Sequence, residues 1–192
     1  MIHGGHWLSS NAAPAATSTG RAEAEEISAR LATSPRGGVM ALLVFFLGSE
    51  RFAVIAGVVQ EIVRAVAVAA LPRAPAIVEG AINFHGTIVP VLDIRHRFRL
   101  PSVPLHPDQH FIIAQTGPRL MALRVDRATE ILEVDESTVE PASRSVPGAE
   151  YVGGIAKLPD GLLVIHDLER FLSLDEAAQV DAATAQASRP QA

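Results

Sequence analysis

The side chains that could ligate a metal ion or move protons are spread thinly along this sequence. Seven histidines occur, at His3, His6, His85, His96, His106, His110 and His166. His106 and His110 stand four residues apart, but Pro107 between them prevents a shared helix face. There is no His-Glu-x-x-His stretch and no cysteine, so the common helical zinc motif and thiolate ligands are absent. We therefore expect no metal site and interpret the histidines as surface or core residues.

Motifs for nucleophilic catalysis and for phosphate binding are also missing from the sequence. There is no Gly-x-Ser-x-Gly elbow and no glycine-rich phosphate loop. The adjacent carboxylates Glu25-Glu26 and Asp135-Glu136 fall in segments that we expect to be solvent-exposed. We predict no catalytic residue and no cofactor. The alternative is a small hydrolase or metal-binding β-barrel that uses His85, His96 and His110.

The composition limits the class of protein further. Hydrophobic residues make up 48% of the chain, and the formal net charge is -5 without any basic stripe. Because nucleic-acid binding depends on Lys and Arg neutralising phosphates, this charge argues against such a partner. The longest strongly apolar run, 39–47, is too short to cross a bilayer, and no signal peptide is evident. The lack of cysteine suits a reducing cytosol, so we expect a soluble cytoplasmic protein.

Short apolar, β-branched runs follow one another in pairs through the middle of the chain. Each pair flanks a turn that contains glycine: 39–47 with 51–55, 80–85 with 87–94, 110–116 with 120–125, and 151–158 with 162–166. Such runs predict β-hairpins, and four hairpins so close together favour an all-β barrel architecture.

The two ends of the sequence differ from this middle part. Residues 1–20 are rich in Ala, Ser, Thr, Gly and Pro and are expected to be disordered without contributing to folding. Residues 21–32 predict a short helix, with Ile27 and Leu31 one turn apart. We divide the chain into an extension at 1–38, a folded body at 39–174, and a helical tail at 175–192 that frays at its end.

One segment of the body is repeated. Gly80–Asp93 (GAINFHGTIVPVLD) and Gly154–Asp167 (GIAKLPDGLLVIHD) match in length and in pattern. Each ends on an aspartate suited to an N-cap, and each is followed by a phenylalanine, Phe98 or Phe171, that we expect to fold back onto its hairpin. We interpret the repeat as two related small barrels, each closed by a short helix. Two unrelated hairpins that happen to agree remain the alternative.

The segment 71–100 carries a further pattern, formed by Pro72, Pro75, Gly80, Asn83, Gly86, Pro90, Asp93 and Arg95. A proline within a strand is expected on a sheet edge or at a bulge, which predicts such a place for Pro90. Four further stretches belong to the same pattern: 59–62 (VQEI), 123–127 (LRVDR), 151–155 (YVGGI) and 163–168 (LVIHDL). In this order, and over the whole folded body, the sequence resembles CheW-like domains.

This resemblance implies an all-β fold of two SH3-like, five-stranded barrels around a shared core. It also implies a cytoplasmic, non-enzymatic scaffold that couples the cytoplasmic tip of a chemoreceptor (a methyl-accepting chemotaxis protein) to the regulatory domain of a CheA-like histidine kinase. The cleft between the barrels, or the Gly80–Gly86 hairpin beside it, would receive the receptor tip. An adaptor of a non-flagellar pathway, such as twitching motility or surface sensing, is the alternative.

The partner-binding residues that the resemblance implies lie in two segments: Val59, Gln60 and Glu61 in one, and Gly80, Asn83, His85 and Gly86 in the other. The sequence departs from the family pattern at His85, where an arginine is usual. An imidazole cannot copy the bidentate fork of a guanidinium. We also expect Glu79 to add a negative charge near this hairpin that the usual motif lacks.

Overall fold

A computed structural model describes residues 18–31, 37–142 and 150–188. Two α-helices, four short 3-10 helices and eleven strands lie in these ranges. In chain order they are α1 (Ser18–Leu31), β1 (Val39–Leu47), β2 (Glu50–Ile55), β3 (Val59–Arg64), β4 (Val78–Phe84), β5 (Thr87–Asp93), β6 (His110–Thr116), β7 (Arg119–Val125), β8 (Arg127–Asp135), β9 (Val139–Pro141), β10 (Val152–Leu158), β11 (Gly161–His166) and α2 (Leu174–Ala187).

The strands form two sheets, and the chain passes from the first to the second and back again. The first sheet has six strands in the order β8-β1-β2-β11-β10-β9, and the second has five in the order β3-β6-β7-β5-β4. The predicted all-β fold of two barrels is confirmed. The first barrel has one strand more than expected because β9 adds three residues at its edge, too few to show an alternating pattern.

Both faces of the central strands are buried, which explains why they are almost continuously apolar. In β1, Leu43, Phe45 and Leu47 belong to a core shared by the two sheets. Leu42 and Val44, on the opposite face, pack in a second cluster inside the first barrel. Because successive side chains of a strand point to opposite faces, a strand between two cores has no polar side. The shared core was predicted, and it includes residues of both sheets.

The four predicted hairpins are all present as β1–β2, β4–β5, β6–β7 and β10–β11. Pro90 was predicted on a sheet edge or at a bulge. The edge position is wrong, because β5 lies between β7 and β4, whereas the bulge of this hairpin lies in β4 opposite Val91 and Leu92, directly beside Pro90. Pro90 pairs across the β4–β5 hairpin with Ala81, whereas the parallel β5–β7 ladder starts only at Val91. Pro90 therefore stands just outside that ladder, where a missing N–H removes no ladder bond.

The repeated segment folds into two hairpins with the same irregularity. The β4–β5 register shifts between Val78 and Gly80, and the β10–β11 register shifts between Val152 and Gly154. In each hairpin, one extra residue is thereby inserted in the first strand, as in a β-bulge. The parallel pairings β5–β7 and β11–β2 also correspond. This agreement supports two related barrels rather than a chance match.

Both copies end on the N-cap that the sequence predicted. The Asp93 carboxylate accepts a hydrogen bond from the Arg95 backbone N–H at 3.1 Å, at the start of the 3-10 helix η2 (Ile94–His96). The Asp167 carboxylate accepts one from the Glu169 N–H at 3.1 Å, at the start of η4 (Leu168–Arg170). A short side-chain acceptor satisfies a backbone donor that has no partner within the helix.

The two phenylalanines behave differently from one another. The centroid of the Phe171 ring lies 5.8 Å from that of Tyr151 and 6.1 Å from that of His166, so Phe171 packs on its own hairpin as expected. The centroid of the Phe98 ring, in contrast, lies 4.6 Å from that of Phe52 and 4.7 Å from that of His166, and both of these residues belong to the first barrel. The expectation that Phe98 folds back onto its own hairpin is therefore wrong. Its ring reaches across to the other barrel and contributes to the shared core.

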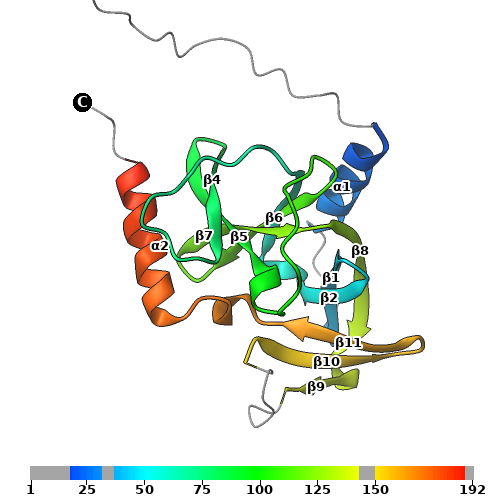
Figure 1. Cartoon of the computed structure of the whole chain (residues 1–192). Coiled ribbons are helices and arrows are strands. Elements are labelled where there is room, and N and C mark those ends of the chain that lie inside the picture. Colours follow the sequence, from blue (N-terminus) through cyan, green and yellow to red (C-terminus); the bar gives the residue numbers. More distant parts are fainter. Residues whose placement is uncertain (1–17, 32–36, 143–149, 189–192) are drawn as a thin grey trace, which may run out of the picture.

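The helices flank the barrels on opposite sides (Figure 1). α1 packs on β3 and β8, and α2 packs along β5. α2 begins with a capping box between Ser173 and Glu176. Residues 18–20 belong to α1, whereas the rest of the segment predicted to be disordered, 1–17, and the end of the tail, 189–192, lie outside the described residues. No helix in the described ranges is long and apolar enough to cross a membrane.

Candidate partner-binding site

The tip of the β4–β5 hairpin is a two-residue turn formed by His85 and Gly86. Phe84 pairs with Thr87, and the φ angles of His85 and Gly86 are 49° and 87°. Two positive φ values are typical of the tight hairpin turn that matches strand twist. The Asn83 side-chain oxygen accepts a hydrogen bond from the Gly86 N–H at 2.8 Å and so fixes the turn. The His85 ring is left exposed, against the edge of Phe84.

A bulge in β3 brings two consecutive polar residues to the surface. Val59 pairs with Ala114 and Glu61 with Ile113, which leaves Gln60 as the extra residue. Without the bulge, Gln60 and Glu61 would point to opposite faces of the strand. Gln60 is exposed and Glu61 half-buried, while Val59 is buried. The bulge therefore lets both polar side chains face outward.

β3 and the hairpin tip meet although β3 and β4 are the two end strands of their sheet. Just beyond β3, Ala69 pairs with Ala81 of β4, which joins the two ends of the sheet. The Glu61 carboxylate then lies 3.4 Å from His85 Nε2. We refer to Gln60, Glu61 and His85 as the seam. The structure thus brings together three of the residues implied by the family resemblance.

The other four residues shape the site from within or at the turn. Asn83 and Gly86 make the turn, and Val59 is buried. Gly80 is buried as well, and a Cβ at this position would lie 2.4 Å from the Ala69 carbonyl oxygen. Any larger residue would push β4 away from the segment that closes the barrel, which is the physical reason for glycine here.

A groove of about 360 Å³ lies between the barrels, next to the seam. Its walls are mainly apolar and come from both sheets, and Ile55 in them is 45% exposed. Gln115 also lines the groove, and its side-chain oxygen is 3.4 Å from the Gln60 side-chain nitrogen. Groove and seam therefore adjoin at the contact between Gln115 and Gln60. Residues that line the groove include Met40, Ile55, Val58, Val139, Ile165, Glu169 and Arg170.

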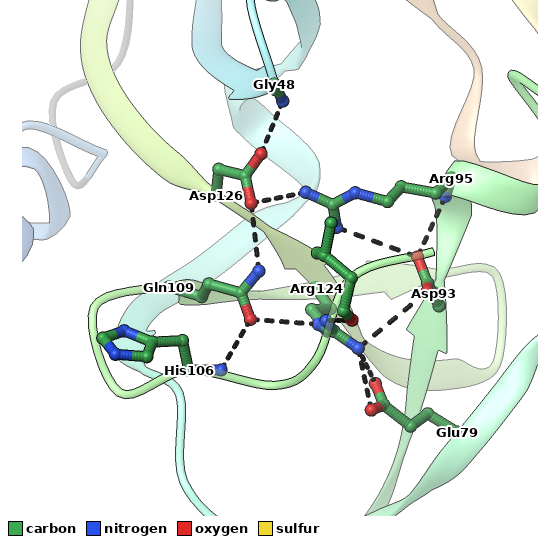
Figure 2. Close-up of polar contacts among 9 residues, drawn as sticks. Gly48, Glu79, Asp93, Arg95, His106, Gln109, Arg124 and Asp126 are labelled. Carbon is green, nitrogen blue, oxygen red and sulfur yellow. Dashed lines mark hydrogen bonds and ion pairs between the residues drawn. The ribbon is translucent and has the colours of Figure 1, made fainter. Parts of the chain in front are cut away.

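A buried network of charges lies at the end of the second barrel (Figure 2). At its centre, Arg124 on β7 is 2% exposed and donates through Nη1 to both Glu79 oxygens at 2.8 Å. Arg124 Nε donates to Gln109 at 3.1 Å, and the Gln109 amide donates to Asp126 at 3.0 Å. Since burying a charge is costly unless it is paired and hydrogen-bonded, these partners are what allow Arg124 to be buried.

The network also links the two barrels. Asp126 accepts hydrogen bonds from Arg95 and from the Gly48 backbone N–H in the β1–β2 turn. Burial raises the pKa of the Asp126 carboxyl, but the bonds from Gly48, Gln109 and Arg95 outweigh it and hold the pKa below its ordinary value. The carboxylate is therefore stabilised as an anion between the two sheets.

The network changes the interpretation of Glu79. We expected this carboxylate to add a negative charge near His85, but its oxygens bind Arg124 inside the barrel. Glu79 is the extra residue of the β4–β5 bulge, which turns its side chain toward β7. The carboxylate beside His85 is instead Glu61. The sequence showed Arg124 and Asp126 only as parts of a family motif, because their partners come from distant segments.

The described histidines have different surroundings and do not converge. His110 and His166 are buried, and burial lowers the pKa of each to about 4. His110 Nδ1 accepts a hydrogen bond from the Ala128 N–H at 3.0 Å, whereas His166 packs against the rings of Phe52 and Phe98. Among residues 18–31, 37–142 and 150–188, no three His, Asp or Glu side chains form a group that could hold a metal ion. His3 and His6 lie outside these ranges.

Comparison with known proteins agrees with this arrangement. Residues 41–176 match the family model of the CheW-like domain. The chain is 30% identical over 141 residues to the chemotaxis protein CheW of Klebsiella aerogenes, covering 72% of this chain and 85% of that protein. For the chemotaxis protein CheW of Treponema pallidum the identity is 28%, covering 70% and 83%. The crystal structure of the scaffolding protein TtCheW from Thermoanaerobacter tengcongensis superposes with a TM-score of 0.65 at 29% identity, covering 71% of this chain and 94% of that one. The chain belongs to the CheW-like domain family.

Proposed function

We propose that this chemotaxis scaffold adaptor couples a chemoreceptor to a CheA-like histidine kinase, and that the receptor tip binds along the groove and the seam. The adaptor role follows from membership of the CheW-like family. The observation that carries the proposed location is the row of contacts that links the groove, through Gln115 and Gln60, to the neighbouring Glu61–His85 pair.

The chemistry of this surface suits a helical hairpin with an apolar ridge and polar flanks. The groove offers exposed apolar area, including Ile55, which a docking helix can cover. The seam offers a carboxylate and an imidazole that already contact each other. A receptor side chain that binds either of them has to compete with this internal pair, so the seam contributes more to selectivity than to affinity.

Kinase binding is assigned to other faces of the barrels, through pairing with the homologous regulatory domain. The chain would act in the cytoplasm as a passive coupler, without catalysis, cofactor or metal. Receptor and kinase bound to one scaffold influence each other through differential contacts in two states of the assembly.

Calorimetric titration of a purified receptor tip tests the proposed location. Ile55→Asp places a charge in the groove, and we expect it to weaken binding at least tenfold because the carboxylate is desolvated on docking. The matched control is Leu162→Asp, since Leu162 is 66% exposed at the β10–β11 turn and does not line the groove. Equal effects of the two substitutions would contradict the groove as the receptor site.

The seam is tested by His85→Arg and His85→Ala in the same titration. A guanidinium stays charged and can bind Glu61 and a receptor carboxylate together, so His85→Arg should strengthen binding up to about tenfold if the tip presents a carboxylate. If the receptor is adapted to the imidazole, His85→Arg should weaken binding instead. Three indistinguishable affinities would remove His85 from the site.

A further inference from the structure

Helix α1 lies outside the part of the chain that matches the family model, which begins at residue 41. It is nevertheless docked on the folded body. The Ile27 side chain is 5% exposed and belongs to the core shared by the two barrels, and Leu31 packs against the same core. The exposed side of the helix includes Glu26 and Ala29. α1 thus lies outside the matched domain, and the side of the helix that carries Ile27 and Leu31 packs on the folded body.

The place where α1 docks is formed by two strand edges. β3 is an end strand of the second sheet, and β8 is an end strand of the first. The Ser28 hydroxyl accepts a hydrogen bond from the Ile62 backbone N–H of β3 at 3.0 Å. The Arg30 guanidinium donates to the Ile131 backbone carbonyl of β8 at 3.2 Å. An edge strand offers unpaired N–H and C=O groups to other chains, and α1 satisfies one such group on each sheet.

The same strand carries the seam. Gln60 and Glu61 directly precede Ile62, whose N–H is bound by Ser28. A partner helix that docks on the outer edge of β3 therefore meets α1 first. The contacts that hold α1 include the apolar side chains of Ile27 and Leu31 and two hydrogen bonds to strand backbone. A competing helix would have to replace these contacts in order to displace α1.

We propose that α1 is a built-in cover of the edge formed by β3 and β8, and that a helix of the receptor tip competes with α1 for this edge. This inference rests on the proposed receptor coupling and adds a regulatory step to it. Molecules in which α1 is docked are closed to the receptor helix, so only the fraction of molecules in which α1 is undocked can bind it. The apparent dissociation constant is then raised by the inverse of the open fraction.

The test uses full-length variants in which α1 is undocked. Ile27→Asp removes the buried anchor, and Ser28→Ala removes the acceptor for the Ile62 N–H while the anchor stays. Ala29→Asp is the control, because it adds the same charge on the exposed side of the helix. We expect hydrogen exchange at the Ile62 amide to accelerate at least tenfold in Ile27→Asp, to a smaller extent in Ser28→Ala, and not in Ala29→Asp.

Receptor-tip affinity should rise in the same order, by about tenfold for Ile27→Asp. Since the chain has no cysteine, a spin label on a single Ala29→Cys can also follow α1 directly, and adding the receptor tip should increase its mobility. Faster exchange at Ile62 with an unchanged receptor affinity would overturn the proposal and leave α1 as a structural edge cap. If thermal melting shows that Ile27→Asp has lost its fold, Ser28→Ala gives the decision.

The same experiments distinguish a failure of the proposed α1 cover from a failure of the proposed receptor site in the groove and the seam. Binding by the wild-type chain that depends on Ile55 but not on Ile27 supports the receptor site and overturns the cover. If Ile27→Asp binds the receptor tip more tightly than the wild type does, the result supports both the receptor site and the cover. If neither the wild type nor Ile27→Asp binds the receptor tip, both proposals are wrong.

Discussion

The two hairpins of the internal repeat have the same backbone but different surroundings. In both, a bulge precedes a glycine under a neighbouring chain segment, and an aspartate ends the second strand as an N-cap. The extra residue of the bulge is Glu79 in one hairpin and Gly153 in the other. Glu79 reaches the buried Arg124, whereas Gly153 has no side chain to reach anything. One substitution at an equivalent backbone position thus changes how a barrel is held together.

The second barrel consequently has an ionic interior at one end, while the corresponding part of the first barrel is aromatic. Arg124 and Arg95 are buried there with Glu79, Asp93 and Asp126 around them. In the first barrel, Asp167 pairs with Arg170 near the surface, and the neutral His166 lies among phenylalanine rings. The comparison indicates that the repeated backbone tolerates either kind of packing as long as buried charges are paired.

The largest expected difference between the barrels follows from Arg124→Met. Removing this guanidinium takes from Glu79 the arginine that it binds and leaves Asp93 with Arg95 alone, and we expect the free energy of unfolding to fall by about 4 kcal/mol. Arg170→Met is the matched change in the first barrel. Because Arg170 and Asp167 are each about one-third exposed, its cost should be about 1 kcal/mol or less. Urea denaturation measures both, and similar costs would contradict the difference between the two ends.

Glycine-to-alanine substitutions test the shared backbone of the two hairpins. The new Cβ would lie 2.4 Å from a backbone oxygen at Gly80, 3.0 Å from the Val139 side chain at Gly154, and 3.5 Å from the nearest atom at Gly153. We expect Gly80→Ala to cost about 3 kcal/mol, Gly154→Ala less, and Gly153→Ala about 0.5 kcal/mol or less. Thermal unfolding ranks the three. A harmless Gly80→Ala would show that the barrel closure at Ala69 can move.

The buried histidines predict a loss of stability on mild acidification. The pKa of His166 is about 4 in the folded chain, against about 6.5 in an unfolded one. Between these values the unfolded chain binds more protons, so the free energy of unfolding falls as the pH drops from about 6.5 toward 4. His110 acts in the same direction.

The substitution His166→Phe separates the contribution of His166 to this pH dependence of stability from the contribution of His110. From pH 7 to pH 4.5, the wild type should lose about 2 kcal/mol more than this variant, because phenylalanine cannot take up a proton. His85→Phe, at an exposed histidine, serves as the control for removing an imidazole. Denaturation curves at both pH values measure the losses. Parallel pH profiles of the wild type and His166→Phe would show that His166 is not a neutral buried group.

Much of the fold was predictable because it depends on neighbours in the sequence. Alternating and continuous apolar runs, glycine turns and the aspartates of the repeat gave the four hairpins, both N-caps and the two-barrel architecture. The short helix with Ile27 and Leu31 on one face was also predicted, within a few residues of its observed bounds. These features depend on spacing over a few residues, which a single sequence shows directly.

What only the tertiary structure decided involves residues far apart in the chain. The partner of Glu79 is on β7, that of His85 is on β3, and α1 docks on the edges of both sheets. The edge position of Pro90 and the packing of Phe98 were misjudged for the same reason, since both depend on which strands become neighbours. Bulges and barrel closure determine which face a side chain takes and which segment it meets. A shift of one residue in register would reverse those faces without changing any local pattern that the sequence shows.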